Sequence, residues 1–141
     1  MIEITLKEVE VPGLDSELFV LWLQRVVKEE HYELGDICLV FCSDLELLEM
    51  NKTYLQHDYF TDILTFDYCY DSVVSGDLFI SIDRIIDNAI LLEEAYLKEL
   101  KRVCVHGVLH LCGYKDKTEV ESKIMRDREE HYIAKFVPRE T

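Results

Sequence analysis

The segment from Leu97 to Gly113 places the strongest constraint on how this chain folds. Its apolar residues recur at helical spacing, and the stretch Val103–Leu111 is nearly all apolar apart from two histidines. This pattern predicts a largely buried helix with Gly113 as its C-terminal stop. His106 and His110 lie four residues apart, so both imidazoles are expected to project from one face of that helix.

Two imidazoles side by side in an apolar helix are costly to bury unless a partner compensates for their lost hydration. A metal ion would do so, because this spacing lets two ring nitrogens reach one ion. Asp116 follows the expected turn at Gly113 and would supply a carboxylate as third ligand. Three protein ligands and one open position are typical of a hydrolytic zinc site. The alternative is a pair of core histidines with satisfied hydrogen bonds, since an H-x-x-x-H pair also arises by chance.

The other segments predict strands and helices that are mixed without strict alternation. Period-two or continuous apolar runs predict strands at residues 2–6, 37–42, 63–68 and 77–82, with a polar connection at 71–76. Helical periodicity predicts helices from about residue 15, from 43 to about 54, over 85–96 and 97–111, and from 118 to about 136. Capping boxes are predicted at Ser43–Glu46 and Thr118–Glu121. We therefore expect an α+β fold, a single domain over residues 1–141 with a small mixed β-sheet of about four strands flanked by about five helices.

Charge restricts the class of partner. The 15 basic and 29 acidic residues among 141 give a net charge of −14, which argues against a protein that coats nucleic acid. The stretch from Lys98 to Arg128, however, contains eight basic and five acidic residues, which gives it a local net charge of +3. Positive charge is therefore concentrated in the segment that carries the predicted metal site.

The five cysteines and the N-terminal sequence point to a reducing compartment. The cysteines include no C-x-x-C pair and mostly sit within apolar runs, as expected for reduced thiols in a core. No apolar run approaches the length of a membrane span, and the first residues lack the pattern of a signal peptide. A cytoplasmic protein without membrane contact is the expectation.

The segment His106–Tyr114 resembles the YbeY-type rRNA maturation endoribonucleases, whose motif reads H-G-x-L-H-L-x-G-Y-D-H. The first nine positions of the motif match. Two upstream segments, Met50–Phe66 and Gly76–Ile80, also resemble that family. The resemblance implies a mixed sheet flanked by helices and a zinc-like metal site. It further implies a metal-dependent endoribonuclease that cleaves single-stranded RNA, matures the 3′ end of 16S rRNA and takes part in ribosome quality control, with rRNA and the ribosome as partners. The basic segment between Lys98 and Arg128 is then expected to direct the RNA to the metal site.

The predicted metal ligands are therefore His106, His110 and Asp116, holding one Zn²⁺ or another divalent ion per chain. Family members usually have His as the third ligand; Asp116 is tolerable there because a carboxylate also binds zinc. The family also commonly has Arg where this chain has Leu55. His57 is the catalytic candidate to replace that charge, with an ordinary exposed histidine as the alternative.

Three other interpretations stay open. A metal-dependent peptidase is disfavoured, because Gly107 stands where the metzincin motif has its general base Glu. A hydrolase of another substrate class is the second, and a ribosome-associated binding module with a structural metal is the third. A fourth protein ligand such as Cys112 would favour the structural role.

Asp62 is predicted either to shape the loop over the metal or to be a turn residue.

Overall fold

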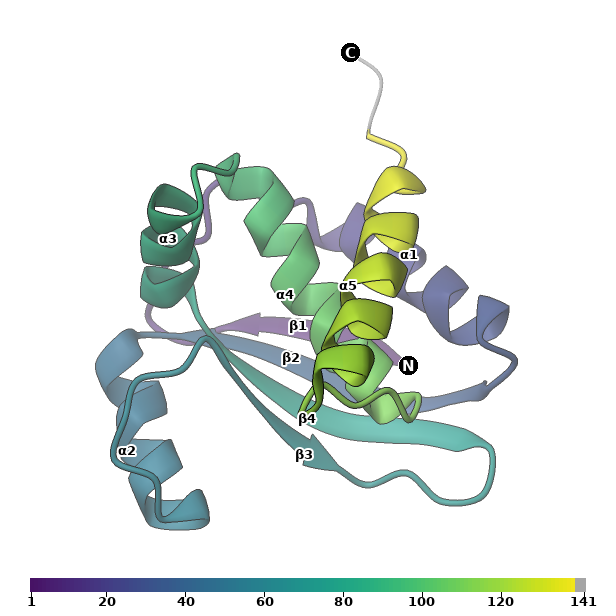
Figure 1. Ribbon diagram of the computed structural model, residues 1–141, viewed down its shortest axis with the longest axis horizontal. Helices are drawn as coiled ribbons and strands as arrows, with labels where there is room; N and C mark the ends of the chain where they lie inside the picture. Colours follow the sequence, from purple (N-terminus) through teal and green to yellow (C-terminus); the bar gives the residue numbers. More distant parts are fainter. Residues whose placement is uncertain (139–141) are drawn as a thin grey trace.

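The computed structural model describes residues 1–138, so the last residues of the predicted domain, 139–141, lie outside the described residues. The described residues form four strands and five helices, and Figure 1 shows how these are arranged. The strands are β1 (Ile2–Leu6), β2 (Glu33–Cys42), β3 (Ile63–Asp67) and β4 (Val73–Ser81). The helices are α1 (Ser16–Glu29), α2 (Asp44–Leu55), α3 (Ile82–Leu91), α4 (Tyr96–Leu111) and α5 (Glu119–Ala134).

The strands form one mixed sheet in the order β1-β2-β4-β3. The pairs β1/β2 and β2/β4 are parallel, whereas β3 runs antiparallel to β4. The parallel pairs are connected through helices, and a short turn joins β3 to β4, as these two kinds of pairing require. The predicted α+β fold with a small mixed sheet is confirmed, and β3 is one edge of that sheet.

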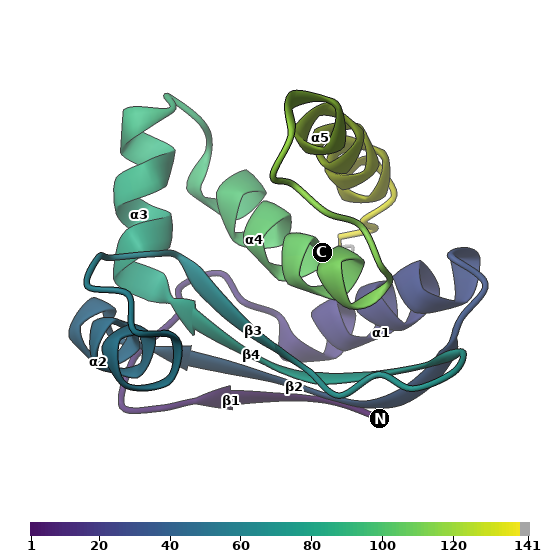
Figure 2. The same ribbon diagram turned by 60° about the horizontal axis from the view of Figure 1, so that its bottom comes forward.

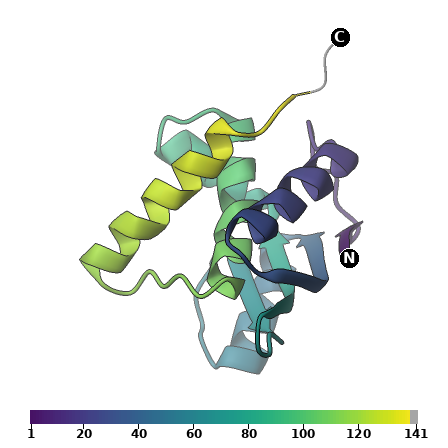
Figure 3. The ribbon, with the colours of Figure 1, turned by 90° about the vertical axis from the view of Figure 1, so that its right-hand side faces the viewer.

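Helices cover one face of the sheet. Alternate residues of β2, Ile37, Leu39 and Phe41, are buried in the main core under these helices. Both α1 and α4 contact the strands, and α5 packs on α4 further from the sheet (Figure 2). Figure 3 shows α4 between α5 and α1, which explains why this helix is apolar on most of its surface.

A smaller cluster occupies the opposite face near α2. Cys42 of β2, Leu47 of α2 and Leu64 of β3 are its buried residues. All five cysteines are free thiols, and Cys42, Cys104 and Cys112 are buried. No helix in residues 1–138 is long and apolar enough to span a membrane.

Gly107 lets α4 approach the sheet closely. A Cβ atom at this position would lie 2.7 Å from Cδ1 of Ile63 and 2.9 Å from Cδ1 of Leu78. Because Gly107 lies between the two histidines in the sequence, this contact places the histidine-bearing segment of α4 beside β3.

Several predicted boundaries are wrong. The polar connection predicted at 71–76 largely belongs to β4, which begins at Val73 because Val73 and Val74 pair with β2. The predicted strand 77–82 is too long at its end, since the Ser81 hydroxyl accepts a hydrogen bond from the Arg84 amide and thereby starts α3 at Ile82. The first long helix ends at Leu91 rather than at 96. The complete capping box at Thr118–Glu121 is confirmed.

Candidate metal centre

The structure brings the three predicted ligands together. His106 and His110 lie on one face of α4, with ring centroids 4.5 Å apart. Gly113 follows the helix with φ of +100°, a left-handed conformation that favours glycine, and the chain turns back to present Asp116. The Oδ2 atom of Asp116 lies 3.3 Å from Nε2 of His106 and 3.2 Å from Nε2 of His110.

Each histidine is also held through its other ring nitrogen. Nδ1 of His106 lies 2.6 Å from Oε2 of Glu129, a residue of α5. Nδ1 of His110 lies 2.9 Å from the backbone carbonyl oxygen of Tyr114. Both partners are acceptors, so each ring in its neutral form would donate from Nδ1 and keep a lone pair on Nε2, the ring atom that lies next to Asp116.

These three side chains fit a tetrahedral metal site. The ligand atoms of His106, His110 and Asp116 all lie within 4.8 Å of one another, and no other such group occurs in residues 1–138. Ligands about 2.0–2.1 Å from a tetrahedral zinc ion are about 3.3 Å apart, which matches the two distances from Asp116. Two neutral imidazoles and one carboxylate are a donor set that zinc accepts.

The candidate site opens into a polar cleft. A cavity of about 410 Å³ lies between α4 and the edge strand β3, with Thr65 and Asp67 of β3 on one wall and the two histidines on the other. Asp62, directly before β3, lines this cleft and also a second cavity of about 260 Å³, and His106 and Asp116 border both. The cleft is acidic, so an RNA phosphate would need a cation there.

Burial and neighbouring charges alter two groups at the site. Burial opposes the charged form of His106, but the hydrogen bond and charge of Glu129 outweigh it and raise the pKa of the imidazole. Burial raises the pKa of the Asp62 carboxyl group, although the nearby His106 acts in the opposite direction.

A family model described as Endoribonuclease YbeY matches residues 2–137. The chain belongs to this family. It is 47% identical to Endoribonuclease YbeY of Bacteroides thetaiotaomicron, over 89% of this chain and 92% of that protein. It is 44% identical to Endoribonuclease YbeY of Phocaeicola vulgatus, over 95% and 97%. The solution structure of TM1509 from Thermotoga maritima resembles it with a TM-score of 0.69 and 28% identity, covering 96% of this chain and 89% of that one.

Membership in the YbeY family confirms the resemblance that the segment His106–Tyr114 carried, and it places the chain among the endoribonucleases, a class of hydrolases. The structure adds to the family motif an aspartate that converges with both histidines. Roles of the individual residues in this chain stay predictions.

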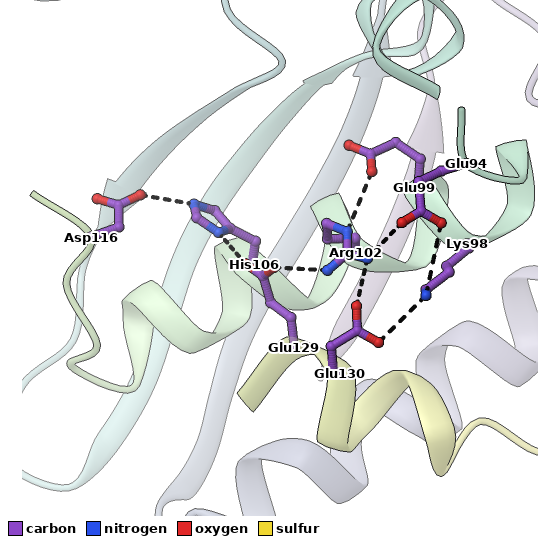
Figure 4. A network of polar contacts seen from close by, with 8 residues as sticks. All are labelled: Glu94, Lys98, Glu99, Arg102, His106, Asp116, Glu129 and Glu130. Atoms are coloured by element: carbon purple, nitrogen blue, oxygen red, sulfur yellow. Dashed lines mark hydrogen bonds and ion pairs between the residues drawn. The ribbon is translucent and has the colours of Figure 1, made fainter. Parts of the chain in front are cut away.

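Sequence reasoning missed Glu129 and the ion-pair network around it. Glu129 lies four residues after Met125 and three before Tyr132, and all three are buried on one face of α5. A carboxylate at a helical position that is otherwise apolar was the signal that could have identified it. Its second oxygen, Oε1, lies 3.3 Å from Nη1 of Arg102, which is buried on α4 (Figure 4).

The structure places His57 outside the cleft lining. His57 follows α2, is exposed, and stacks on Tyr59, whose hydroxyl lies 2.9 Å from its Nδ1. It is not among the residues that line either cavity next to Asp116. Leu55, at the position where family members commonly have Arg, is partly exposed at the end of α2.

Half of the basic segment 98–128 is engaged in other contacts. Lys98, Arg102 and Arg128 form ion pairs with glutamates, and Lys101 lies over the Phe136 ring. These four cations are therefore less available to attract RNA than the remaining four. In the described part of the chain, the other four cations have neither an ion pair nor a ring contact: Lys115, Lys117, Lys123 and Arg126.

Proposed function

We propose that the chain, as one domain over residues 1–141, is a zinc-dependent endoribonuclease that cleaves single-stranded RNA in the cytoplasm. Its proposed role is maturation of the 3′ end of 16S rRNA and ribosome quality control. Family membership supports RNA as the substrate class. The observation that carries the metal dependence is the convergence of His106, His110 and Asp116, each with one ligand atom directed at a common point.

A divalent ion held by these three residues would supply Lewis acidity toward a phosphate oxygen and lower the pKa of a water ligand. The protein residues do the remaining work. His106 and His110 donate from Nδ1 and keep Nε2 available, and Asp116 supplies negative charge. We assign Asp62 the role of proton acceptor, because it lines the cleft and burial makes it a stronger base than an exposed aspartate.

The walls of the cleft suit an extended single strand. β3 is an edge strand, so its outer backbone groups are available to a strand of RNA that runs along it. The four cations of the basic segment that have neither an ion pair nor a ring contact lie between residues 115 and 126, which follow His110 in the chain. They would attract the phosphate backbone, and binding should weaken as salt is added.

The alternative function, a binding module with a structural metal, would need a fourth protein ligand, for which Cys112 was the candidate. Within residues 1–138 the metal-binding group has three members, and Cys112 is packed in the main core instead of joining them. Three ligands leave a position open for reaction, as in catalytic zinc sites.

Metal analysis of purified protein tests the first part of the proposal. We expect about one zinc ion per chain, as three ligands for one ion imply, and loss of the ion in a His106→Ala/His110→Ala variant. His131→Ala is a matched control, since His131 pairs with Glu29 away from the cleft. Protein that stays metal-free when zinc is supplied would contradict the metal site.

Cleavage assays test the second part. Wild-type protein should cut single-stranded RNA and spare a duplex of the same sequence, and a chelator should abolish cleavage. Asp62→Asn should lower the cleavage rate by about 10²–10⁴-fold, as for loss of a general base, with unchanged zinc content. Zinc-loaded protein that leaves single-stranded RNA intact would favour a hydrolase of another substrate class.

A further inference from the structure

The hydrogen-bond partner of His106 on the side away from Asp116 comes from a distant part of the sequence. The Nδ1 atom of His106 is 2.6 Å from a carboxylate that comes from another helix, α5. That carboxylate, Glu129, is only 4% exposed. Burying a carboxylate costs several kcal/mol unless it is paired and hydrogen-bonded, and Glu129 has two such partners, His106 and Arg102.

Stability alone does not account for a carboxylate at this position. Its neighbours on the same face of α5, Met125 and Tyr132, belong to the main core. Replacing buried charged groups by well-packed apolar residues is often neutral or stabilising. Packing therefore does not require an Arg102–Glu129 pair at this place, and the contact with His106 gives the carboxylate a second role besides balancing Arg102.

The network fixes which way the carboxylate faces. Nη1 of Arg102 binds Oε1 of Glu129, which leaves Oε2 directed at His106 (Figure 4). On its far side His106 presents Nε2 to Asp116, 3.3 Å away. A hydrogen bond from Nδ1–H thus sets both the tautomer and the rotation of the ring, and it makes Nε2 a better electron donor.

We propose that Glu129, held by Arg102, is a positioning residue for metal binding at His106, so that α5 contributes to metal affinity without touching the ion. This inference rests on the proposed metal site. It assigns a function to a residue that lies 23 positions from its histidine in the chain.

The neighbouring residue offers a matched control. Glu130 also binds Arg102, with Oε1 2.7 Å from Nη2, and it lies 3.5 Å from the Lys98 ammonium group. Its side chain is 44% exposed, and none of its contacts in the described part of the chain reaches His106. Glu129→Gln and Glu130→Gln therefore each remove one carboxylate charge next to Arg102, but only the first removes the charged partner of His106.

Zinc affinity should separate the two variants. Competition with a chromophoric chelator should show affinity about 10–100-fold weaker for Glu129→Gln, the usual effect of losing such an outer partner. Glu130→Gln should stay within about 3-fold of wild type, because its contacts lie on the far side of Arg102. In zinc-loaded wild-type protein, ¹⁵N NMR should show His106 protonated at Nδ1, and this signal should shift in Glu129→Gln alone.

Folding is checked on the same samples. Circular dichroism of the metal-free variants establishes that each is folded; if Glu129→Gln is not, Glu129→Asp keeps the charge on a shorter side chain and should show an intermediate loss of affinity. Equal zinc affinities for the Glu129 and Glu130 variants, with wild type binding zinc normally, would overturn the inference and leave the proposed function intact. Absence of zinc binding by the wild type would overturn both.

Discussion

The two histidines of the candidate metal centre are held in place by two different parts of the molecule. His110 donates to the backbone carbonyl of Tyr114, four residues further along the chain. His106 donates to the side chain of Glu129, on a helix that reaches it only through tertiary packing. One anchor is neutral and set by a local turn, whereas the other is charged and depends on how α5 docks on α4.

The two histidines therefore depend on different parts of the structure. The local anchor needs the chain to reverse direction at Gly113, which has φ of +100°. The tertiary anchor needs a buried ion pair, since Glu129 is oriented by Arg102. Changes to the turn should affect His110 first, and changes to the α4–α5 interface should affect His106 first.

The largest effect is expected from Arg102→Met, which breaks the tertiary anchor. Glu99 and Glu129 are both buried and lie within 3.4 Å of the Arg102 guanidinium group. Removing one partner of a buried ion pair leaves uncompensated charge and typically costs about 3–5 kcal/mol. Urea unfolding of the metal-free protein, followed by circular dichroism, should show a loss of that size in the free energy of unfolding.

Arg126→Met is the matched control for Arg102→Met. Arg126 is an exposed residue of α5 and has no ion pair within residues 1–138. Its replacement should change the free energy of unfolding by less than about 0.5 kcal/mol. If Arg102→Met were equally mild, the buried network would not stabilise the α4–α5 interface.

The next largest effect is expected from Gly113→Ala, which strains the local anchor. Space is available, because a Cβ atom at this position would meet nothing closer than the Tyr32 hydroxyl at 3.8 Å. The cost is in the backbone, where a non-glycine residue at such a φ loses about 2 kcal/mol. Thermal unfolding should show this loss, and zinc affinity should fall because the Tyr114 carbonyl moves away from His110.

Gly113→Asn sharpens the same test. Asn enters the left-handed region more readily than Ala, so it should destabilise the protein less. An Ala variant with unchanged zinc affinity would show that the carbonyl of Tyr114 does not need this turn to hold His110.

The sequence predicts the local part of the site but not the part that depends on tertiary packing. His106, His110 and Asp116 fall within eleven residues, so helical spacing and a glycine stop were enough to predict that they converge. Glu129 could not be assigned to His106 in this way, because which helices pack together depends on the whole core. The sequence shows only that a carboxylate falls on the apolar face of α5.

The fold shows a similar division. The strand and helix types were predicted from periodicity, but the start of β4 was missed because Ser75 and Gly76 look like a polar turn. Pairing with β2 extends the strand back to Val73, and pairing partners are not visible in a local pattern. Some contacts of the basic segment are not visible in a local pattern for the same reason, since Arg102 pairs with Glu129 of α5 and Arg128 pairs with Glu30, which directly follows α1.

Tyr114, whose carbonyl holds His110, is itself hydrogen-bonded to the distant residue Glu30. The pH dependence of stability should show the contribution of Glu30. Glu30 accepts hydrogen bonds from the Tyr114 and Tyr132 hydroxyls and from Arg128. Burial raises the pKa of Glu30, but the three hydrogen bonds outweigh burial and leave the pKa below its ordinary value of 4.5. A depressed pKa in the folded state contributes stability above the unfolded pKa, and this contribution is lost as pH falls through the folded value.

Glu30→Gln tests this by comparison with wild type. The variant should be less stable by about 1.5 kcal/mol at neutral pH, the value of hydrogen bonds to a charged group. The difference in the free energy of unfolding should stay constant down to about pH 5. Below about pH 4.5 it should shrink, because Glu30 of wild type binds a proton first in the unfolded chain and, at still lower pH, in the folded protein. Urea unfolding at a series of pH values measures it, and a difference that grows on acidification would mean that the folded pKa is raised instead.

The smallest effect is expected from Tyr114→Phe, which separates the side chain of Tyr114 from its backbone. The variant loses the hydrogen bond to Glu30 but keeps the carbonyl that accepts from His110. Glu30 retains Tyr132 and Arg128 as donors, so the free energy of unfolding should fall by only about 1 kcal/mol. Zinc affinity, measured by chelator competition, should stay within about 2-fold of wild type, because a backbone anchor is set by the turn and not by the phenol. A loss as large as that expected for Glu129→Gln would show that His110, like His106, depends on a side chain held by a distant helix, and the contrast between the two anchors would then disappear.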